Sequence, residues 1–251
     1  MSDTQAPEES FISHLVELRN RLLYATYGFL AVALLLFAWP GQQQIYDFLA
    51  HPMLAALPQG TKMIATGVIA PFFVPLKVTL MAAFVVALPW IFYQAWAFIA
   101  PGLYTHEKRL VLPLVISSSL LFVAGIAFCY FLVFGRVFSF IYSLAPKSIT
   151  VAPDIENYLD FVLNMCLAFG LTFEVPVVVV VLVRMGIVEV ARLKAIRPYV
   201  IVGAFLISAI VTPPDAISQL SLAIPMCLLY ELGLILAPLF VRATQAPQSN
   251  E

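Results

Sequence analysis

Long apolar stretches separated by short polar segments make up most of this 251-residue sequence. Six of them are predicted to be membrane-spanning helices, at about residues 22–39, 72–98, 112–134, 158–183, 198–211 and 216–239. The fifth, at about 14 residues, reaches only about 21 Å, whereas a hydrocarbon core is about 30 Å thick. We therefore expect an all-α polytopic membrane protein, with one membrane domain over residues 1–241 and a polar tail over residues 242–251.

Two other segments have the helical spacing of amphipathic helices that lie at the membrane interface. The first follows a tail at residues 1–10, predicted to be disordered, and runs into the first span. The second covers about residues 45–57 and is expected to kink at Pro52. The first segment has adjacent apolar and polar stripes, formed by Phe11, Leu15, Leu18 and Leu22 and by Ser10, His14, Glu17 and Arg21.

Composition supports the membrane assignment and excludes several functions. The chain is 62% hydrophobic and 11% charged, whereas soluble domains have about 45–50% apolar and about 25% charged residues. Its net charge of -1 gives no basic surface of the kind that binds nucleic acid. The cysteine and histidine spacings match no metal site, and the motifs of common hydrolases and nucleotide-binding enzymes are missing. We expect no enzyme activity, no metal and no cofactor.

The basic residues predict the orientation of the spans. Nine Lys and Arg residues fall on the side that holds both termini and four on the other side, so both termini are predicted to be cytoplasmic. The nine are Arg19, Arg21, Lys108, Arg109, Arg184, Arg192, Lys194, Arg197 and Arg242, and the four are Lys62, Lys77, Arg136 and Lys147.

Two carboxylates are candidates for recognising a cation at the cytoplasmic face. Glu107 follows a Pro-Gly turn and has no opposite charge three or four residues away, so it has no local helical partner. Glu17 precedes Arg21 by four residues, which favours an ion pair between them. Aromatic surface near Glu107, including Phe98, would favour bidentate bonds to guanidinium groups. The alternatives are an ordinary loop residue for Glu107 and a local surface ion pair for Glu17.

Three further acidic residues lie in or beside predicted spans. Glu174 falls deep in the fourth span, where a carboxylate costs roughly 2.5 kcal/mol or more, so a functional role is favoured over a purely structural bond. Glu231 lies nearer the inner end of the sixth span, where the structural reading is favoured. Asp215 precedes that span and is expected to cap its helix.

The chain also resembles a known family, TatC, the receptor subunit of the twin-arginine protein translocase. The resemblance spans roughly residues 10–240 and rests on motifs that occur in the family's order. These motifs are 14–22 (HLVELRNRL), 96–104 (WAFIAPGLY), 106–109 (HEKR), 173–176 (FEVP), 197–199 (RPY) and 212–215 (TPPD).

The resemblance implies a fold and a function. It implies a concave cup of six helices in the bacterial inner membrane that binds twin-arginine signal peptides of folded preproteins. It also implies single-span TatA and TatB partners, homo-oligomers, and export driven by the proton-motive force. The family's recognition residues fall on Glu17, Arg19 and Glu107, with Phe98 close by, its buried glutamate on Glu174, and its outer-loop aspartate on Asp215.

One alternative function remains from the sequence. A proton-coupled solute transporter would use Glu174 as its proton carrier. The lack of an internal repeat counts against it, because secondary transporters are often built from inverted repeats.

Overall fold

The computed structural model describes residues 6–56, 63–99, 111–144, 152–212 and 215–242. These residues are almost all helical, and among them the only β-type pairing is an isolated bridge between Ile64 and Asp154. The predicted all-α class is thus confirmed. The chain divides into two compact units, residues 1–46 with 75–119 and residues 47–74 with 120–251.

Five helical runs are long and apolar enough to cross a membrane, and Arg197–Val211 is a shorter apolar helix. The elements are α1 (Ala6–Ala38), α2 (Gln42–Ala56), α3 (Ala70–Ile99), α4 (Val111–Phe128), the π-helix η3 (Cys129–Val133), α5 (Phe134–Ser143), α6 (Ile155–Phe173), α7 (Val175–Arg184), α8 (Val190–Ala195), α9 (Arg197–Val211) and α10 (Ala216–Arg242).

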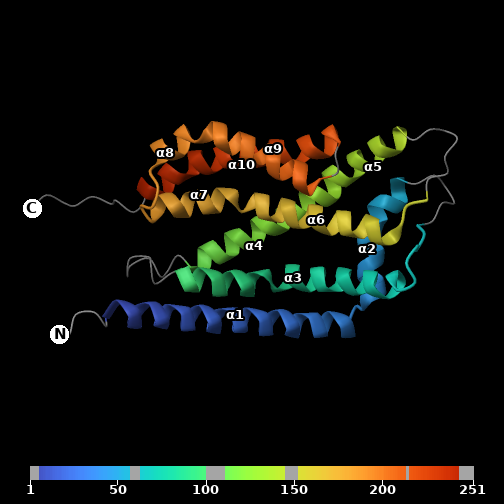
Figure 1. The fold of residues 1–251 in the computed structure, drawn as a ribbon, viewed down its shortest axis with the longest axis horizontal. Coiled ribbons are helices and arrows are strands. Elements are labelled where there is room, and N and C mark those ends of the chain that lie inside the picture. Colours follow the sequence, from blue (N-terminus) through green and yellow to red (C-terminus); the bar gives the residue numbers. More distant parts are fainter. Residues whose placement is uncertain (1–5, 57–62, 100–110, 145–151, 213–214, 243–251) are drawn as a thin grey trace, which may run out of the picture. The chain divides into compact units, whose positions relative to one another are not determined.

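The first helix is longer and straighter than the sequence predicts. Residues 6–10 are helical, not disordered, and the predicted interfacial segment continues into the span as one helix (Figure 1). Its 33 residues give a length of about 50 Å, more than a bilayer core requires. The segment of residues 10–22 is therefore collinear with the first predicted span, because both belong to one continuous helix.

The helical run that contains the third predicted span extends beyond that span. It continues from Val111 through η3 to Ser143, about nine residues beyond the predicted end at Phe134. The predicted span ended near Phe134, with Arg136 just beyond it. In α5 Arg136 lies on an exposed face, while Phe134, Val137 and Phe138 are buried on the other. The segment is therefore an amphipathic extension of the helix.

Two tyrosine hydroxyls fix α2 within the second unit. Pro52 has no N–H, so the carbonyl of Phe48, four residues earlier, lacks its usual helical donor. The Tyr130 hydroxyl donates to that carbonyl at 2.6 Å, and its ring stacks on Phe48 with centroids 5.1 Å apart. The Tyr158 hydroxyl donates to the next carbonyl, that of Leu49, at 3.1 Å. The two tyrosine hydroxyls thus attach α2 to the rest of the second unit close to Pro52, where the sequence predicted a kink.

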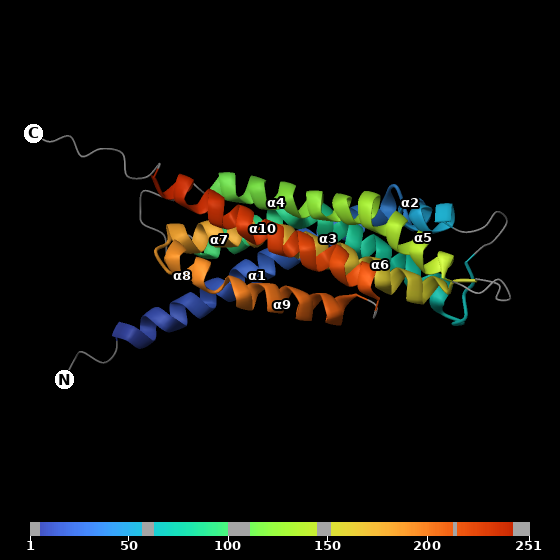
Figure 2. The ribbon, with the colours of Figure 1, turned by 90° about the horizontal axis from the view of Figure 1, so that it is seen from above.

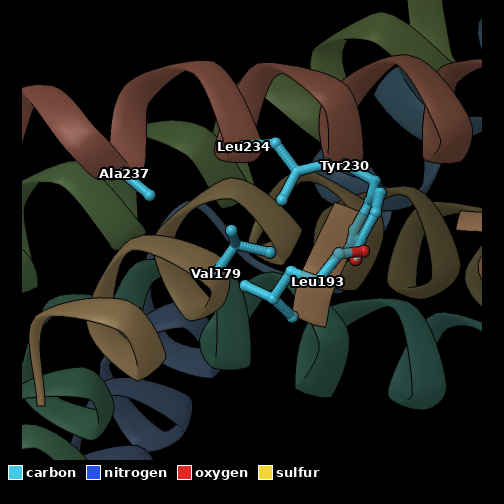
Figure 3. Packing of buried hydrophobic residues seen from close by; sticks show 5 residues of the cluster. All are labelled: Val179, Leu193, Tyr230, Leu234 and Ala237. Carbon is cyan, nitrogen blue, oxygen red and sulfur yellow. Dashed lines mark hydrogen bonds between the residues drawn. The ribbon is translucent and has the colours of Figure 1, made fainter. Parts of the chain in front are cut away.

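The last four helices share a small apolar core in the second unit. Its buried members are Val179, Leu193, Tyr230, Leu234 and Ala237 (Figure 3). The Tyr230 hydroxyl donates to the Leu193 carbonyl at 2.8 Å, which ties the short α8 to α10. Helix α9 lies alongside α10 (Figure 2).

Asp154 joins two segments of the second unit that are far apart in the sequence. Its carboxylate caps α6 by accepting from the Asn157 amide at 3.0 Å, and it also accepts from the Thr66 amide at 3.0 Å and the Thr66 hydroxyl at 2.6 Å. The Ile155 amide donates to the Ile64 carbonyl beside it at 2.8 Å. These donors, led by the Thr66 hydroxyl, lower the pKa of Asp154 from 3.8 to about 2.

Close packing of α4 against α6 predicts a large effect for one small substitution. A Cβ at Gly125 would lie 2.5 Å from the backbone oxygen of Phe169, which cannot move without moving α6. We expect Gly125→Ala to destabilise the protein by about 1–3 kcal/mol, as overpacking does. The matched control is Gly203→Ala in α9, where a Cβ meets nothing within 4 Å and helix propensity favours alanine. Denaturant unfolding in mixed micelles measures both, and equal stability of the two variants would contradict the prediction.

The Asp154 contacts predict a local pH dependence. Because the folded-state pKa is depressed, the contacts persist above about pH 4 and are lost as the pH falls through about 2. Asp154→Asn should weaken them at neutral pH, since an amide has one acceptor oxygen in place of two. We expect faster hydrogen exchange at the Ile64 and Ile155 amides. Asp47→Asn, at an exposed position in α2, is the control, and equal exchange in both variants would disprove the role of Asp154.

Candidate functional site

Two helices of the first unit, α1 and α3, bring several of the predicted site residues together. They pack closely at Gly28, where an added Cβ would lie 2.2 Å from the Trp90 ring. The Trp90 indole N–H donates to the Tyr24 carbonyl at 2.8 Å. Helices α1 and α3 run side by side (Figure 1), and residues 14–21 of α1 contact the last turns of α3.

A buried amide organises that polar stripe. Gln94, in an otherwise apolar stretch of α3, is 4% exposed, and its Oε1 accepts from Arg21 Nη1 at 3.3 Å. Arg21 Nη2 also donates to Glu17 Oε1 at 3.4 Å, which confirms the predicted pair. The Glu17 and Arg21 side chains are 36% and 31% exposed, so the pair itself contributes at most about 1 kcal/mol. Its main effect is to hold the Glu17 carboxylate in a defined position.

Arg19 takes no part in this network. It is exposed, and among the residues that the structure describes it makes no hydrogen bond or ion pair. Residues two apart on a helix point in different directions, so Arg19 does not hold Glu17. The guanidinium is therefore available for a ligand or a partner.

Phe98 lies in the last turn of α3 and stacks on His14 of α1. The two ring centroids are 4.4 Å apart and the planes differ by 25°. Two residues earlier, the buried Trp96 indole donates to Ser118 Oγ of α4 at 3.3 Å. His14 thus contacts the ring of Phe98, and the Trp96 bond ties the same end of α3 to α4.

The most prominent candidate from the sequence, Glu107, lies outside the described residues, as does the whole stretch 100–110. Its position relative to Glu17 and Phe98 stays a prediction. The described helix α3 ends at Ile99, directly before that stretch.

Glu174 lies in the second unit, at the break between α6 and α7. It is 8% exposed. Pro176 has no N–H to donate to the Thr172 carbonyl, and the Glu174 amide donates to the Leu171 carbonyl at 3.1 Å as α6 ends. The helical run is therefore interrupted near Pro176, and the break places the Glu174 carboxylate within an apolar helical run.

Asp215 also belongs to the second unit and caps α10 as expected. Its Oδ1 accepts from the Ser218 amide at 2.7 Å. The preceding residues 213–214 lie outside the described residues.

Glu231 has the structural partner that the sequence could not identify. Arg197 Nη2 donates to Glu231 Oε2 at 2.6 Å, which joins the start of α9 to α10 across 34 residues of sequence. Glu231 therefore has an ion-pair partner of the kind that the structural interpretation requires.

Comparison with known proteins identifies the family. The family model described as Sec-independent protein translocase protein (TatC) matches residues 13–225. The chain belongs to the TatC family. Sec-independent protein translocase protein TatC of Haemophilus influenzae is 50% identical over 231 residues, covering 91% of this chain and 89% of the relative. The protein of the same name from Escherichia coli K12 is 47% identical over 241 residues, covering 96% and 91%.

A solved structure agrees with this assignment. The crystal structure of the twin arginine translocase receptor TatC matches with a TM-score of 0.78 and 38% identity, covering 90% of this chain and 98% of that one. A second crystal structure of that receptor, in the detergent DDM, gives a TM-score of 0.80 and 37% identity. This TatC-family chain is therefore a multi-pass membrane protein of the protein translocase class.

Sequence reasoning missed two contacts at the site of this TatC-family chain. Gln94 carried a recognisable signal, because a lone amide in an apolar helix must find a partner within the protein. The stacking of His14 on Phe98 carried none, because the two residues are 84 positions apart.

The Arg197–Glu231 pair gives a prediction about stability. Both side chains are more than 40% exposed, so we expect Glu231→Gln and Arg197→Gln each to destabilise by less than about 1 kcal/mol. The double variant should lose no more stability than either single variant, because each single substitution already removes the same interaction. Denaturant unfolding of all three variants measures this. Additive losses would show that the two residues act independently.

Proposed function

We propose that this chain is the core receptor of a twin-arginine translocation system and not an enzyme. In this proposal it binds twin-arginine signal peptides of folded preproteins at its cytoplasmic face. With single-span TatA- and TatB-type subunits and other copies of itself, it supports their export across the inner membrane, driven by the proton-motive force. Both termini are then cytoplasmic.

The main support for the proposal is that the chain matches the TatC family over nearly its whole length. The relatives are matched over about nine tenths of their own length. The geometry supports it: Arg21 donates to Glu17 and to Gln94, which positions the Glu17 carboxylate, and Arg19 is exposed two positions from Glu17.

The mechanism follows from the charges. Glu107 binds a guanidinium of the signal, with Glu17 assisting, because carboxylate and guanidinium form strong paired hydrogen bonds. The apolar part of the signal then enters the membrane along the helices. Glu174 supplies a polar group within the apolar region for a partner subunit, and Asp215 acts at the outer loop.

The decisive experiment removes the charge of Glu107. A charge-assisted hydrogen bond is worth roughly 1.5–3 kcal/mol, so Glu107→Gln should lower binding of a twin-arginine signal peptide by at least about tenfold. Site-specific crosslinking of the signal to membranes that contain the chain measures this. The matched control is Glu189→Gln, which removes an exposed carboxylate between α7 and α8.

Unchanged crosslinking in Glu107→Gln would refute the role of Glu107. Solute uptake by the chain alone in liposomes, abolished by Glu174→Gln, would overturn the receptor proposal as a whole, because a receptor moves nothing without its partners.

A further inference from the structure

The stacked rings of His14 and Phe98 form an aromatic surface at the edge of the candidate site. Both residues belong to the first unit, and their centroids are 4.4 Å apart. Phe98 is half-buried and His14 is exposed. One face of the imidazole is covered by Phe98, so its other face is the accessible aromatic surface.

This surface has rigid support. Phe98 follows the buried Trp96, which is bonded to Ser118 at 3.3 Å, and α1 is tied to α3 through the bond from Arg21 to Gln94 at 3.3 Å. Both rings are therefore carried by helices whose relative position is fixed. A ligand meets a preformed surface, which reduces the entropy lost on binding.

A carboxylate lies next to the rings along α1. Glu17 comes three residues after His14, so the two side chains are neighbours on one helix face. Arg21 contacts only Oε1 of Glu17, at 3.4 Å, and within the described ranges Oε2 has no partner. The site thus combines an open aromatic face with an available carboxylate oxygen.

A guanidinium group fits this combination better than an ammonium group. It is planar, so it can stack on an aromatic ring while its in-plane N–H groups donate to a carboxylate. An ammonium group is a compact, strongly hydrated charge and cannot lie flat on a ring. The combination of rings and carboxylate therefore favours arginine over lysine.

We propose that the His14–Phe98 pair is a platform on which one guanidinium of the signal peptide stacks, with its N–H edge directed at Glu17 Oε2. His14 then becomes a residue that determines specificity for arginine over lysine. This inference rests on the proposed function and adds a residue and a mode of recognition to it.

The test compares two signal peptides that differ only in having Arg-Arg or Lys-Lys at the paired position. Fluorescence anisotropy measures their affinity for the full-length chain in lipid nanodiscs. We expect His14→Leu to lower the affinity for the Arg-Arg peptide by about fivefold, the size of a partly exposed cation–π contact, and to leave the Lys-Lys affinity nearly unchanged. The ratio of the Arg-Arg affinity to the Lys-Lys affinity should therefore fall by about the same factor.

Two further variants separate stacking from folding. His14→Phe keeps an aromatic face and should preserve the affinity ratio. Tyr27→Leu removes an aromatic side chain of α1 that is 61% exposed and has no place in the site, so it should leave both affinities unchanged. Thermal unfolding of each variant confirms that the chain remains folded.

The outcomes distinguish the two proposals. If the wild-type chain prefers Arg-Arg and His14→Leu keeps the same ratio, the platform is overturned and the receptor function stands. A ratio that falls equally in His14→Phe and His14→Leu also overturns stacking. If the wild-type chain binds neither peptide, the proposed function fails and the platform fails with it.

Discussion

A polar group in an apolar helix must find its partner within the protein, because hydrocarbon offers none. Gln94 of α3 meets this requirement through Arg21, and Arg21 in turn holds Glu17. The position of the Glu17 carboxylate is therefore a consequence of satisfying a buried amide. Without Gln94, Arg21 would keep only a weak surface pair, and Glu17 would sample many rotamers.

The same requirement governs the prolines of the second unit. Pro52 deprives the Phe48 carbonyl of its donor, and the Tyr130 hydroxyl replaces it. The π-helix η3 contains Tyr130, and a π-turn changes the direction of the side chains that follow it. A proline that would weaken an isolated helix thus gives α2 a specific attachment to the rest of its unit.

Interactions between residues close together in the sequence could be predicted from it, whereas interactions between residues far apart in the sequence could not. The apolar runs, the pair of Glu17 with Arg21, and the cap at Asp215 depend on neighbours within four residues, and the structure contains all of them. Contacts across 34 residues for Arg197 with Glu231, or 84 for His14 with Phe98, depend on how helices pack, which local patterns do not encode.

The α9–α10 pair constrains the membrane around it. Helix α9 has 15 residues and spans about 22 Å. Asp215, which caps α10, and Glu231 within α10 are 16 residues apart, which corresponds to about 24 Å. Because Arg197 binds Glu231, the start of α9 lies at the same height as Glu231 of α10. Both side chains of this ion pair are more than 40% exposed. The length of α9 and the separation of Asp215 from Glu231 are therefore similar, and both are shorter than a hydrocarbon core of about 30 Å. A helix as short as α9 requires the bilayer to thin beside it or apolar residues on its flanks to complete the span.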